Sequence, residues 1–333
     1  MLAARYYGIG QVRTENIPMP VYGPGQALVK VAYAGICGSD LHIFRKGMFM
    51  TSIPETMGHE FSGVVEQIGE GVTEVHPGDH VVGDPRVSCG ACKWCREGSY
   101  NLCPGLGFIG EVMPGCFAEY LVLDEKKLIK VPDSVDLRRA ALVEPLAVAL
   151  HIAGQGRFSG TKHLGVVGAG PIGLITVIVA KAMSVKQISV IDISQDRLEL
   201  ASRLGASCLD SFPSGEFDMP DTVVEAVGVE SALAGALRWL KPQGRLVMAG
   251  LYEDNITIDP NDIVVKELEL AGVDAYETGD LHRAVELLAD GMPEIDHVIT
   301  HVLLLESTAA AFDMLTSVEK KACKILLAPI AER

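Results

Sequence analysis

The sequence predicts an α/β protein of two domains, in which a β-rich N-terminal region precedes a doubly wound parallel sheet. Three observations lead to this class. The 333 residues suffice for about two domains, and 48% hydrophobic with 21% charged residues is typical of globular proteins, which excludes disorder. The first third holds short apolar runs broken by glycine and proline. From about Leu146 onward, strand-like runs alternate with helix-like segments.

The first third is predicted to be antiparallel β structure, because its apolar runs are short and bounded by turn-forming residues. Helix signals are scarce in this part of the chain. The candidate strands are Ala27–Tyr33, Phe61–Gly69, His80–Gly83 and Phe117–Leu123.

The second part is predicted to form a parallel sheet, since its strands are separated by segments of helical period. A helix is expected over Arg197–Leu204, where Gly205 would end it. The candidate strands are Leu164–Val167, Ile188–Asp192, Thr222–Val227, Arg245–Ala249 and Leu268–Val273. After Val273 the expected elements are helix Leu281–Ala289, strand Val298–Leu304, helix Thr308–Leu315 and strand Lys324–Ala328.

The net charge of −15 argues against nucleic acid and membrane surfaces as partners, because an acidic protein is repelled by phosphate groups. The N-terminus lacks the apolar core of a signal peptide, so we expect a cytoplasmic protein. The long uncharged stretch His163–Ala180 contains four glycines and Pro171, which favours a buried strand, turn and helix over a membrane span.

Four of the eight cysteines, Cys89, Cys92, Cys95 and Cys103, follow the spacing C-x2-C-x2-C-x7-C. In a reducing compartment such clustering indicates metal binding rather than disulfides. Four thiolates suit tetrahedral zinc and leave no open position, so this zinc would be structural. An iron–sulfur cluster is the rival interpretation.

Cys37, His59 and Glu60, with Glu144 available later in the chain, form a second and mixed set of candidate ligands. A thiolate, an imidazole and a carboxylate are the set that catalytic zinc uses, because three protein ligands leave a position for water or substrate oxygen. Beyond Cys37, the side chains of Ser39 and His42 could relay a proton from a buried site to solvent.

A glycine-rich motif follows the apolar run Leu164–Val167 and opens a predicted helix; its defining residues are Gly168, Gly170, Pro171, Ile172 and Gly173. Such a turn places a pyrophosphate at a helix N-terminus. Asp192 ends the next apolar run, where its carboxylate can bind ribose hydroxyls and repel a 2′-phosphate. NAD is therefore favoured over NADP. Arg197, on the following helix, is a further candidate cofactor contact, or a solvated surface residue.

These motifs together resemble the zinc-dependent medium-chain alcohol dehydrogenases, in particular their polyol and sorbitol dehydrogenase-like branch, which also holds threonine and butanediol dehydrogenases. The resemblance spans nearly the whole chain. The elements that carry it are Cys37-Gly-Ser-Asp-Leu-His42, Gly58-His59-Glu60, the four-cysteine segment, Gly115-Cys-Phe-Ala-Glu-Tyr120, Glu144-Pro-Leu and Gly168 to Gly173.

The resemblance implies a GroES-like catalytic domain of residues 1–145 and 274–333 and a Rossmann NAD-binding domain of residues 146–273. It implies two zinc ions per chain, with Cys37 and His59 holding the catalytic one and either Glu60 or Glu144 completing the set. Asp40 would orient His59. A homodimer or homotetramer is also implied.

The activity that the resemblance implies is hydride transfer between a secondary alcohol and NAD, with the proton leaving through Ser39, the nicotinamide ribose and His42. The substrate would be a polyol or a related polar alcohol, or the corresponding ketone; threonine or a vicinal diol is the alternative. Ile43 stands where sorbitol dehydrogenases commonly have an aromatic residue, which argues against sorbitol itself. A zinc-free reductase would typically lack the four-cysteine segment and the pair of Cys37 and His59, and a methyltransferase would leave both sets unexplained. A non-catalytic zinc-stabilised binding protein is a further alternative, which zinc content tests: about two ions per chain support catalysis, and only one supports a structural role.

Overall fold

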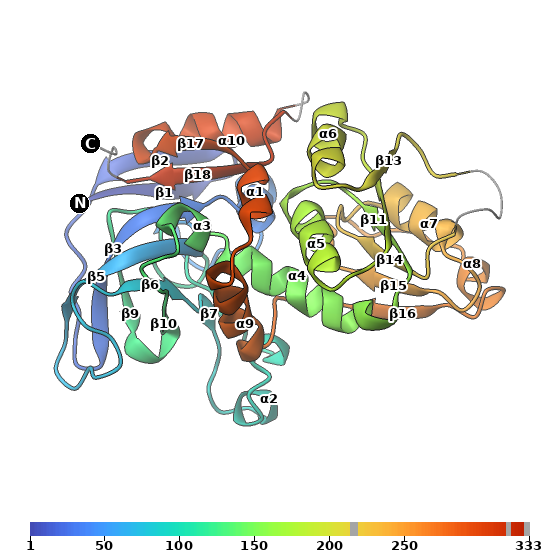
Figure 1. The fold of residues 1–333 in the computed structure, drawn as a ribbon. Coiled ribbons are helices and arrows are strands. Elements are labelled where there is room, and N and C mark those ends of the chain that lie inside the picture. The colour runs from blue at the N-terminus through green and yellow to red at the C-terminus, as the bar shows by residue number, and fades with distance from the viewer. Residues whose placement is uncertain (214–218, 318–320, 330–333) are drawn as a thin grey trace. The chain divides into compact units, whose positions relative to one another are not determined.

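The computed structural model describes residues 1–213, 219–317 and 321–329, which form two compact units. Unit 1 comprises Met1–Glu144, Glu277–Val318 and Lys324–Arg333, and unit 2 comprises Pro145–Tyr276 and Glu319–Cys323. The chain thus leaves unit 1 after Glu144 to form most of unit 2, returns at Glu277, and passes through unit 2 once more over the short segment Glu319–Cys323. Figure 1 shows the elements of both units.

Unit 1 is built around a seven-stranded sheet of order β10-β6-β5-β3-β18-β17, with β9 also paired to β3. The long strands β3 and β5 pair antiparallel with two register shifts in their ladder, and β3 also pairs antiparallel with β9. The strands are β3 (Gln26–Gly35), β5 (Glu60–Ile68), β6 (His80–Gly83), β9 (Tyr120–Asp124), β10 (Leu128–Lys130), β17 (Ile299–Leu304) and β18 (Lys324–Ala328).

Strand β18 closes this sheet from the far end of the sequence. It pairs antiparallel with β3 and parallel with β17, and all five of its residues are buried. The helix between the two C-terminal strands, α10 (Thr308–Thr316), contributes Phe312 to the core, where its ring lies near those of Phe44 and Phe117. The C-terminal segment is therefore part of the core of unit 1.

Two smaller sheets and four further helices complete unit 1. The first sheet joins β1 (Leu2–Gly8), β2 (Gln11–Asn16) and β4 (Glu55–Thr56), and the second joins β7 (Arg86–Val87) and β8 (Gly107–Phe108). The helices are α1 (Gly38–Lys46), α2 (Lys93–Arg96), α3 (Leu137–Ala140) and α9 (Thr278–Ala289).

Unit 2 is a six-stranded parallel sheet of order β13-β12-β11-β14-β15-β16. The order reverses at β11, so right-handed connections place α5 and α6 on one face and α7 on the other. The strands are β11 (His163–Val167), β12 (Gln187–Ile191), β13 (Ser207–Leu209), β14 (Thr222–Glu225), β15 (Arg245–Met248) and β16 (Glu269–Gly272). The helices are α4 (Val143–Gln155), whose first two residues belong to unit 1, α5 (Pro171–Ala182), α6 (Gln195–Arg203), α7 (Glu230–Trp239) and α8 (Asn261–Val264).

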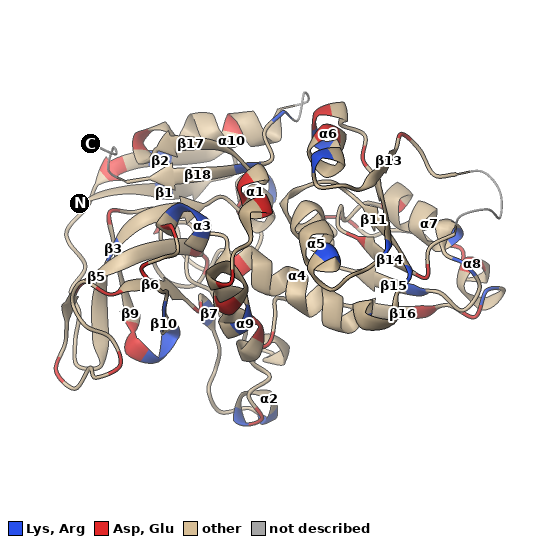
Figure 2. Ribbon diagram, in the orientation of Figure 1, with Lys and Arg blue, Asp and Glu red and all other residues tan. Residues whose placement is uncertain are grey.

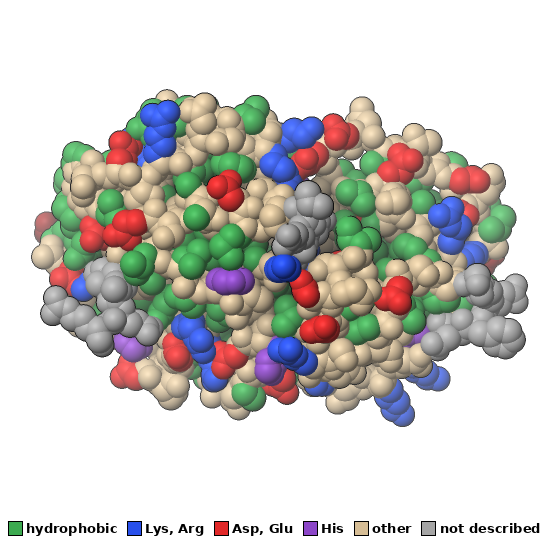
Figure 3. Space-filling model, turned by 90° about the horizontal axis from the view of Figure 1, so that it is seen from above, with side chains coloured by type: hydrophobic (Ala, Val, Ile, Leu, Met, Phe, Trp, Pro, Cys, Tyr) green, Lys and Arg blue, Asp and Glu red, His purple; other side chains and the backbone are tan. Residues whose placement is uncertain are grey.

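Helix α5 explains the long uncharged stretch of the sequence. It carries a single charged residue, Lys181, and eight of its residues are buried (Figure 2). No described helix is both long and apolar enough to cross a bilayer. On the face seen in Figure 3, acidic, basic and apolar side chains are interspersed.

The predicted fold class is confirmed, and most predicted strands occur within one or two residues of their expected bounds. The strand predicted over Phe117–Leu123 is wrong in its first half: β9 begins at Tyr120, because Phe117 is fully buried and bonds through its backbone to Met57 and Ala4 instead of extending β9. Helix α1 and the strands β1 and β2 were not anticipated. The unit boundaries after Glu144 and Tyr276 lie one residue before and three residues after the predicted divisions, and Glu319–Cys323 group with unit 2.

Candidate functional site

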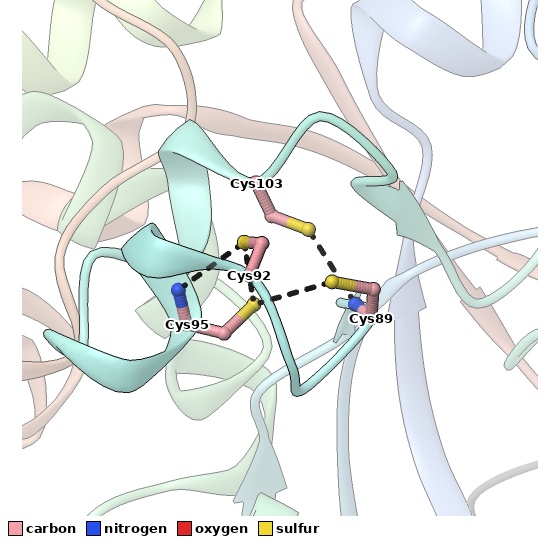
Figure 4. Close-up of side chains that lie close together, drawn as sticks. All are labelled: Cys89, Cys92, Cys95 and Cys103. Atoms are coloured by element: carbon pink, nitrogen blue, oxygen red, sulfur yellow. Dashed lines mark hydrogen bonds between the residues drawn. The ribbon is translucent and has the colours of Figure 1, made fainter.

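The four cysteines of the segment 89–103 lie together, with their sulfur atoms directed toward one another (Figure 4). The Sγ atom of Cys95 is 3.9 Å from that of Cys89 and 3.5 Å from that of Cys92. Zinc–sulfur bonds of about 2.3 Å at tetrahedral angles require sulfur separations of about 3.8 Å. The cluster therefore fits a tetrahedral metal ion with four thiolate ligands.

The backbone of the segment directs these sulfur atoms inward. Cys92 caps the short helix α2 and accepts a hydrogen bond from the amide of Cys95 at 3.4 Å, while the amide of Cys89 donates to Cys103 at the same distance. Hydrogen bonds from the backbone amides of Ala91 and Cys92 lower the pKa of the Cys89 thiol to about 6. The amide of Cys95 lowers the pKa of Cys92, but burial and contacts with the other three thiols outweigh it and raise this pKa to about 11. Cys89 is thus the thiol most readily presented as a thiolate, the form that binds metal.

A second cluster in unit 1 brings together Cys37, His59 and Glu60, whose candidate ligand atoms all lie within 4.8 Å of one another. Cys37 precedes α1, and His59 and Glu60 lie at the start of β5. Gly58 turns the chain at this point with a φ of +91°, and any side chain there would clash with the ring of Phe117. His59 and Glu60 are buried, which limits access of water to the cluster.

Asp40 is fully buried and interacts with Cys37 and His59 of this cluster. Its Oδ2 atom accepts a hydrogen bond of 2.8 Å from the amide of Cys37, which fixes the start of α1. Burial raises the pKa of Asp40, although the charge of His59 opposes this rise. Among the described residues, Oδ1 of Asp40 and Nδ1 of His59 have no hydrogen-bond partner. Buried polar atoms left in this state are compatible with a site completed by a metal ion.

The imidazole of His59 is surrounded by negative charge. Burial alone would lower its pKa, but the charge of Cys37, a hydrogen bond with Cys37 and the charges of Asp40 and Glu144 raise the pKa of His59 well above its usual value. Ser39 Oγ lies 3.5 Å from His59 Nε2. His42 follows Ser39 by one helical turn and is half-buried.

Glu144 is not part of the 4.8 Å cluster, although it is buried and its charge acts on His59. The structure therefore brings Cys37, His59 and Glu60 into direct proximity and places Glu144 nearby. Sequence reasoning left the choice between the two glutamates open.

Two neighbours of this cluster were not found from the sequence. The buried ammonium of Lys324 forms an ion pair with Glu60, and the ring of Phe108 lies edge-on to His59 with 5.5 Å between ring centroids. Lys324 is 264 residues from Glu60 in the chain, and Phe108 belongs to a two-residue strand, so no local pattern indicates either contact.

In unit 2, the glycine-rich turn joins β11 to α5. Gly168 has a φ of +100°, a conformation that other residues rarely adopt, and a Cβ atom on Gly173 would clash with the carbonyl oxygen of Gly168. At Gly170 the nearest atom to an added Cβ is Arg197 Nη1, at 3.9 Å. Pro171 occupies the first turn of α5, and Ile172 follows it there. The turn is closely packed at its two ends and open at its middle glycine.

Asp192 and Arg197 approach this turn from the end of β12 and from α6. The Asp192 carboxylate accepts hydrogen bonds from the amides of Ala169 and Ser194, at 2.6 Å and 2.8 Å. Arg197 donates to the carbonyl of Ala322 at 3.2 Å. Both side chains therefore have fixed positions beside the glycines, at the edge of a parallel sheet where such folds bind ligands.

Glu225 organises the neighbouring loops at the same edge, a role that sequence reasoning missed. Its fully buried carboxylate accepts hydrogen bonds from the amides of Val227 and Gly228 and from the hydroxyl of Tyr252. Burial and the charge of Glu225 raise the pKa of Tyr252 well above its usual value. Tyr252 also lines a surface hollow of about 730 Å³ together with Met248, Glu253, Asp254, Asn255 and Ile256.

Three exposed apolar side chains lie just beyond the carboxyl ends of β12, β14 and β15: those of Ile193, Val227 and Leu251, which are 84%, 43% and 47% exposed. Exposed apolar side chains at such positions can cover the flat rings of a dinucleotide. These three residues could have been identified in the sequence, because each lies at or just beyond the end of a predicted apolar strand.

The sequence matches two protein-family models. Residues 23–133 match the alcohol dehydrogenase GroES-like domain, and residues 171–290 match the zinc-binding dehydrogenase domain. Among curated relatives, D-xylulose reductase A of Aspergillus oryzae is 35% identical over 92% of this chain and 90% of its own length. Sorbitol dehydrogenase of Bacillus subtilis is 31% identical over 99% of this chain and 97% of its own length.

Solved structures agree over the whole chain. The 2R,3R-butanediol dehydrogenase from Bacillus subtilis superposes with a TM-score of 0.90 at 32% identity, covering 99% of both chains. A structure described as a zinc-binding dehydrogenase from Sinorhizobium meliloti, bound to NADP, superposes with a TM-score of 0.91 at 31% identity. The match covers 98% of this chain and 99% of that chain. A short chain alcohol dehydrogenase of Escherichia coli, complexed with NADH, gives 0.90 at 32% identity with the same coverage.

Proposed function

The chain belongs to the zinc-dependent medium-chain alcohol dehydrogenase family, and from this premise we propose that it oxidises a secondary hydroxyl of a polyol or related polar alcohol with NAD. The observation that carries the proposal is the buried cluster of Cys37, His59 and Glu60. A thiolate, an imidazole and one carboxylate hold a zinc ion while leaving a position for a substrate oxygen. A non-catalytic role, in which zinc only stabilises the fold, does not account for a second and mixed ligand set.

The chemistry of the reaction divides between the bound groups and the chain. When bound, zinc would supply Lewis acidity toward the alcohol oxygen, and the nicotinamide ring would supply the hydride acceptor. The chain holds the metal through Cys37 and His59, with Glu60 or Glu144 as the third ligand. Burial of His59 and Glu60 excludes water from the reacting atoms, and Phe108 packs against the imidazole.

The proton of the alcohol is proposed to leave through Ser39. Its hydroxyl lies 3.5 Å from Nε2 of the candidate metal ligand His59. The hydroxyl is therefore close enough to the candidate metal site to accept the proton of the alcohol. His42, one helical turn further and half-buried, then passes the proton to solvent. Both residues belong to α1. The capping contacts between Cys37 and Asp40 fix the start of this helix, and so they hold Ser39 and His42 in position for the relay.

The cofactor is proposed to be NAD, bound at the glycine-rich turn by Gly168, Gly170, Pro171, Ile172 and Gly173. The pyrophosphate would lie at the N-terminus of α5, and the carboxylate of Asp192 would bind the ribose hydroxyls. A 2′-phosphate in that position would meet the negative charge of Asp192, which disfavours NADP. Arg197 supports the same site from α6.

A second zinc ion is proposed for Cys89, Cys92, Cys95 and Cys103. Four thiolates complete a tetrahedral site, so this ion has a structural role. The proposed content is therefore two zinc ions per chain. An iron–sulfur cluster at the same cysteines would give a coloured protein, which absorbance measurements detect directly.

The chain is further proposed to form a homodimer or homotetramer in the cytoplasm, where thiols of such clusters stay reduced. Strand β16 supports self-association, because it is an edge strand with Leu270 41% exposed, and the nearby Val264 and Val265 are 68% and 74% exposed. An exposed edge with apolar neighbours readily pairs with another chain. Light scattering after size-exclusion chromatography gives the number of chains; a monomer would contradict the proposal.

The test of function is a panel of polyols, sugar acids, vicinal diols and amino alcohols, including threonine, each supplied with NAD or NADP. We expect NAD reduction, followed by the absorbance of the reduced ring, with at least one polyol or diol. If the protein binds two zinc ions and NAD but oxidises no member of the panel and reduces no corresponding ketone, the proposed reaction is wrong.

A further inference from the structure

We propose that Phe108 couples the two candidate metal clusters of unit 1. Metal at the four-cysteine segment holds strand β8 in place, and Phe108 on β8 then positions the candidate ligand His59. The inference rests on the proposed function, because it assumes the two metal ions proposed there. It makes the binding of one ion favour the binding of the other.

Phe108 contacts the mixed cluster, which consists of Cys37, His59 and Glu60. Its ring lies edge-on to the imidazole of His59, with 5.5 Å between ring centroids and 60° between the ring planes. Contacts of this kind favour one orientation of both rings. Among the described residues, Nδ1 of His59 has no hydrogen-bond partner. Phe108 therefore supplies a restraint that a hydrogen-bonded neighbour provides for many metal-binding histidines.

Strand β8 is short and its pairing is limited. Its two residues form a two-stranded sheet with β7, in which Phe108 pairs with Arg86. One backbone hydrogen bond of 2.9 Å joins the residues that flank the two strands, and Thr51 holds the following turn through the carbonyl of Glu111. A ladder of two residue pairs is marginal by itself. The position of β8 therefore depends on what holds it against β7.

Strand β7 is fixed to the rest of unit 1 by Arg86, which is fully buried. The guanidinium donates to the carboxylate of Asp84 at 2.9 Å and 3.0 Å and to the hydroxyl of Thr278 at 3.1 Å. It also lies 5.7 Å from the ring centroid of Tyr100. Tyr100 belongs to the four-cysteine segment, so this segment contacts the same side chain that fixes β7.

The four-cysteine segment is the loop that joins β7 to β8. Cys89 lies two residues after the end of β7, and Cys103 lies four residues before the start of β8. The amide of Cys89 donates to Sγ of Cys103 at 3.4 Å, so ligands from the two ends of the loop meet. Closing a long loop costs conformational entropy, and a metal ion that joins its ends offsets this cost. Metal at the four thiolates therefore stabilises the pairing of β7 with β8 and the position of Phe108.

The two metal sites are linked in both directions by this arrangement. If metal at the four-cysteine segment restrains Phe108, and Phe108 restrains His59, the mixed cluster binds metal more tightly when the segment is occupied. Linkage requires that metal at the mixed cluster tightens binding at the segment by the same factor. A single edge-to-face aromatic contact sets this factor at about 3- to 10-fold.

The experiment measures zinc affinities of the full-length protein by equilibrium competition with a colorimetric chelator. The variant Cys95→Ser retains only the ion of the mixed cluster, and this ion should bind about 3- to 10-fold more weakly than in the unmodified protein. Phe108→Leu should weaken binding at the same cluster by a similar factor while the four cysteines stay occupied. Adding Cys95→Ser to Phe108→Leu should then change the affinity by less than about 2-fold, because the connection is already broken.

Two controls separate this connection from a general loss of stability. Phe108→Tyr keeps the ring, so Cys95→Ser should have its full effect in that background. Phe158→Leu removes a buried ring from unit 2, and Cys95→Ser should also have its full effect there. The variant Cys37→Ser, which retains only the ion of the four-cysteine segment, identifies which binding step belongs to which site.

Two results would overturn the inference: an unchanged zinc affinity of the mixed cluster in Cys95→Ser, or effects of Cys95→Ser and Phe108→Leu that multiply in the double variant. If Cys95→Ser does not fold, the coupling is measured at the four-cysteine segment instead. Its affinity should fall by the same factor in Cys37→Ser, and should be equal in Phe108→Leu with and without Cys37→Ser. Failure of the proposed function looks different, because the unmodified protein would then hold no more zinc than Cys37→Ser.

Discussion

The carboxylate of Asp192, at the end of β12, accepts a hydrogen bond of 2.6 Å from the backbone amide of Ala169 in the glycine-rich turn. The two residues are 23 positions apart, and the bond joins two neighbouring strands of the sheet at their carboxyl ends. The side chain of Asp192 therefore both fixes the shape of the turn and provides the negative charge beside it. Replacing Asp192 should consequently affect cofactor choice and local order together.

Replacing Asp192 with serine should relax the preference for NAD. Removing the carboxylate abolishes its hydrogen bonds to ribose and its repulsion of a 2′-phosphate, a change of about 1.5–3 kcal/mol. The ratio of kcat/KM for NAD to that for NADP should fall by about 10- to 100-fold in steady-state assays. Asp196→Ser, on the exposed first turn of α6, is the control. An unchanged ratio would discredit the assignment of Asp192.

Replacing Cys37 with serine or His59 with alanine should abolish turnover while leaving cofactor binding within about 3-fold of normal. Both side chains belong to the cluster of unit 1, whereas the glycine-rich turn belongs to unit 2. Zinc content should fall from two ions to one, and NADH binding can be followed by fluorescence. Cys208→Ser, far from both clusters in the chain, should keep both properties. Loss of NADH binding with two zinc ions retained would instead give Cys37 and His59 a structural role.

Replacing Cys95 with serine should remove the other zinc ion. Cys95 contacts both Cys89 and Cys92 through sulfur, so its loss removes one of the four candidate ligands and two contacts of the cluster. Metal analysis should show one zinc per chain, and limited proteolysis should cut within the segment 88–104, because a structural zinc site contributes directly to folding. Retention of two zinc ions and of protease resistance would show that these thiols bind no metal.

Asp84 and Arg86 should make stability dependent on pH. Burial alone would raise the pKa of Asp84, but hydrogen bonds and charge from Arg86, together with Lys127, lower it below its usual value. Because the folded pKa is depressed, the stabilisation is present above the unfolded value of about 4 and is lost as pH falls below it.

The variant Asp84→Asn removes the carboxylate that balances the charge of the fully buried Arg86 and should lower the free energy of unfolding by about 3 kcal/mol at pH 7. Urea unfolding midpoints of the variant and the unmodified protein should converge below about pH 4. Asp79→Asn, which breaks a more exposed pair with Lys130, should cost less than about 1 kcal/mol. A constant difference at all pH values would exclude a role for the charge of Asp84.

The parallel sheet of unit 2 was predictable because each of its strands is a local apolar run bounded by turn residues. The geometry of the glycine-rich turn was also predictable, because the positive φ at Gly168 and the close packing at Gly173 both require glycine. The candidate ligands Cys37, His59 and Glu60 were predictable from residue type, and their proximity followed only from the family resemblance. Local sequence patterns therefore predict most of the fold of unit 2. In unit 1 they predict which residues are candidate ligands, but not how these residues are arranged.

The remaining features depend on contacts between distant parts of the chain. Helix α1 was missed because its short sequence is dominated by polar residues and only Asp40 and Ile43 are buried. The pair of Glu60 and Lys324 forms across β3, which lies between β5 and β18 in the sheet. A lysine near the C-terminus of an acidic protein is ordinarily solvated, and nothing nearby in the sequence marks this one as buried.

The position of β18 between β3 and β17 has a consequence for synthesis on the ribosome. Strand β9 covers residues 26–30 of β3, but the end of that edge at Ala34 and Gly35 pairs only with β18, which is made about 290 residues later. The nascent chain therefore exposes this unpaired end of β3 until β18 has been made, and a chain truncated before Lys324 would leave it open.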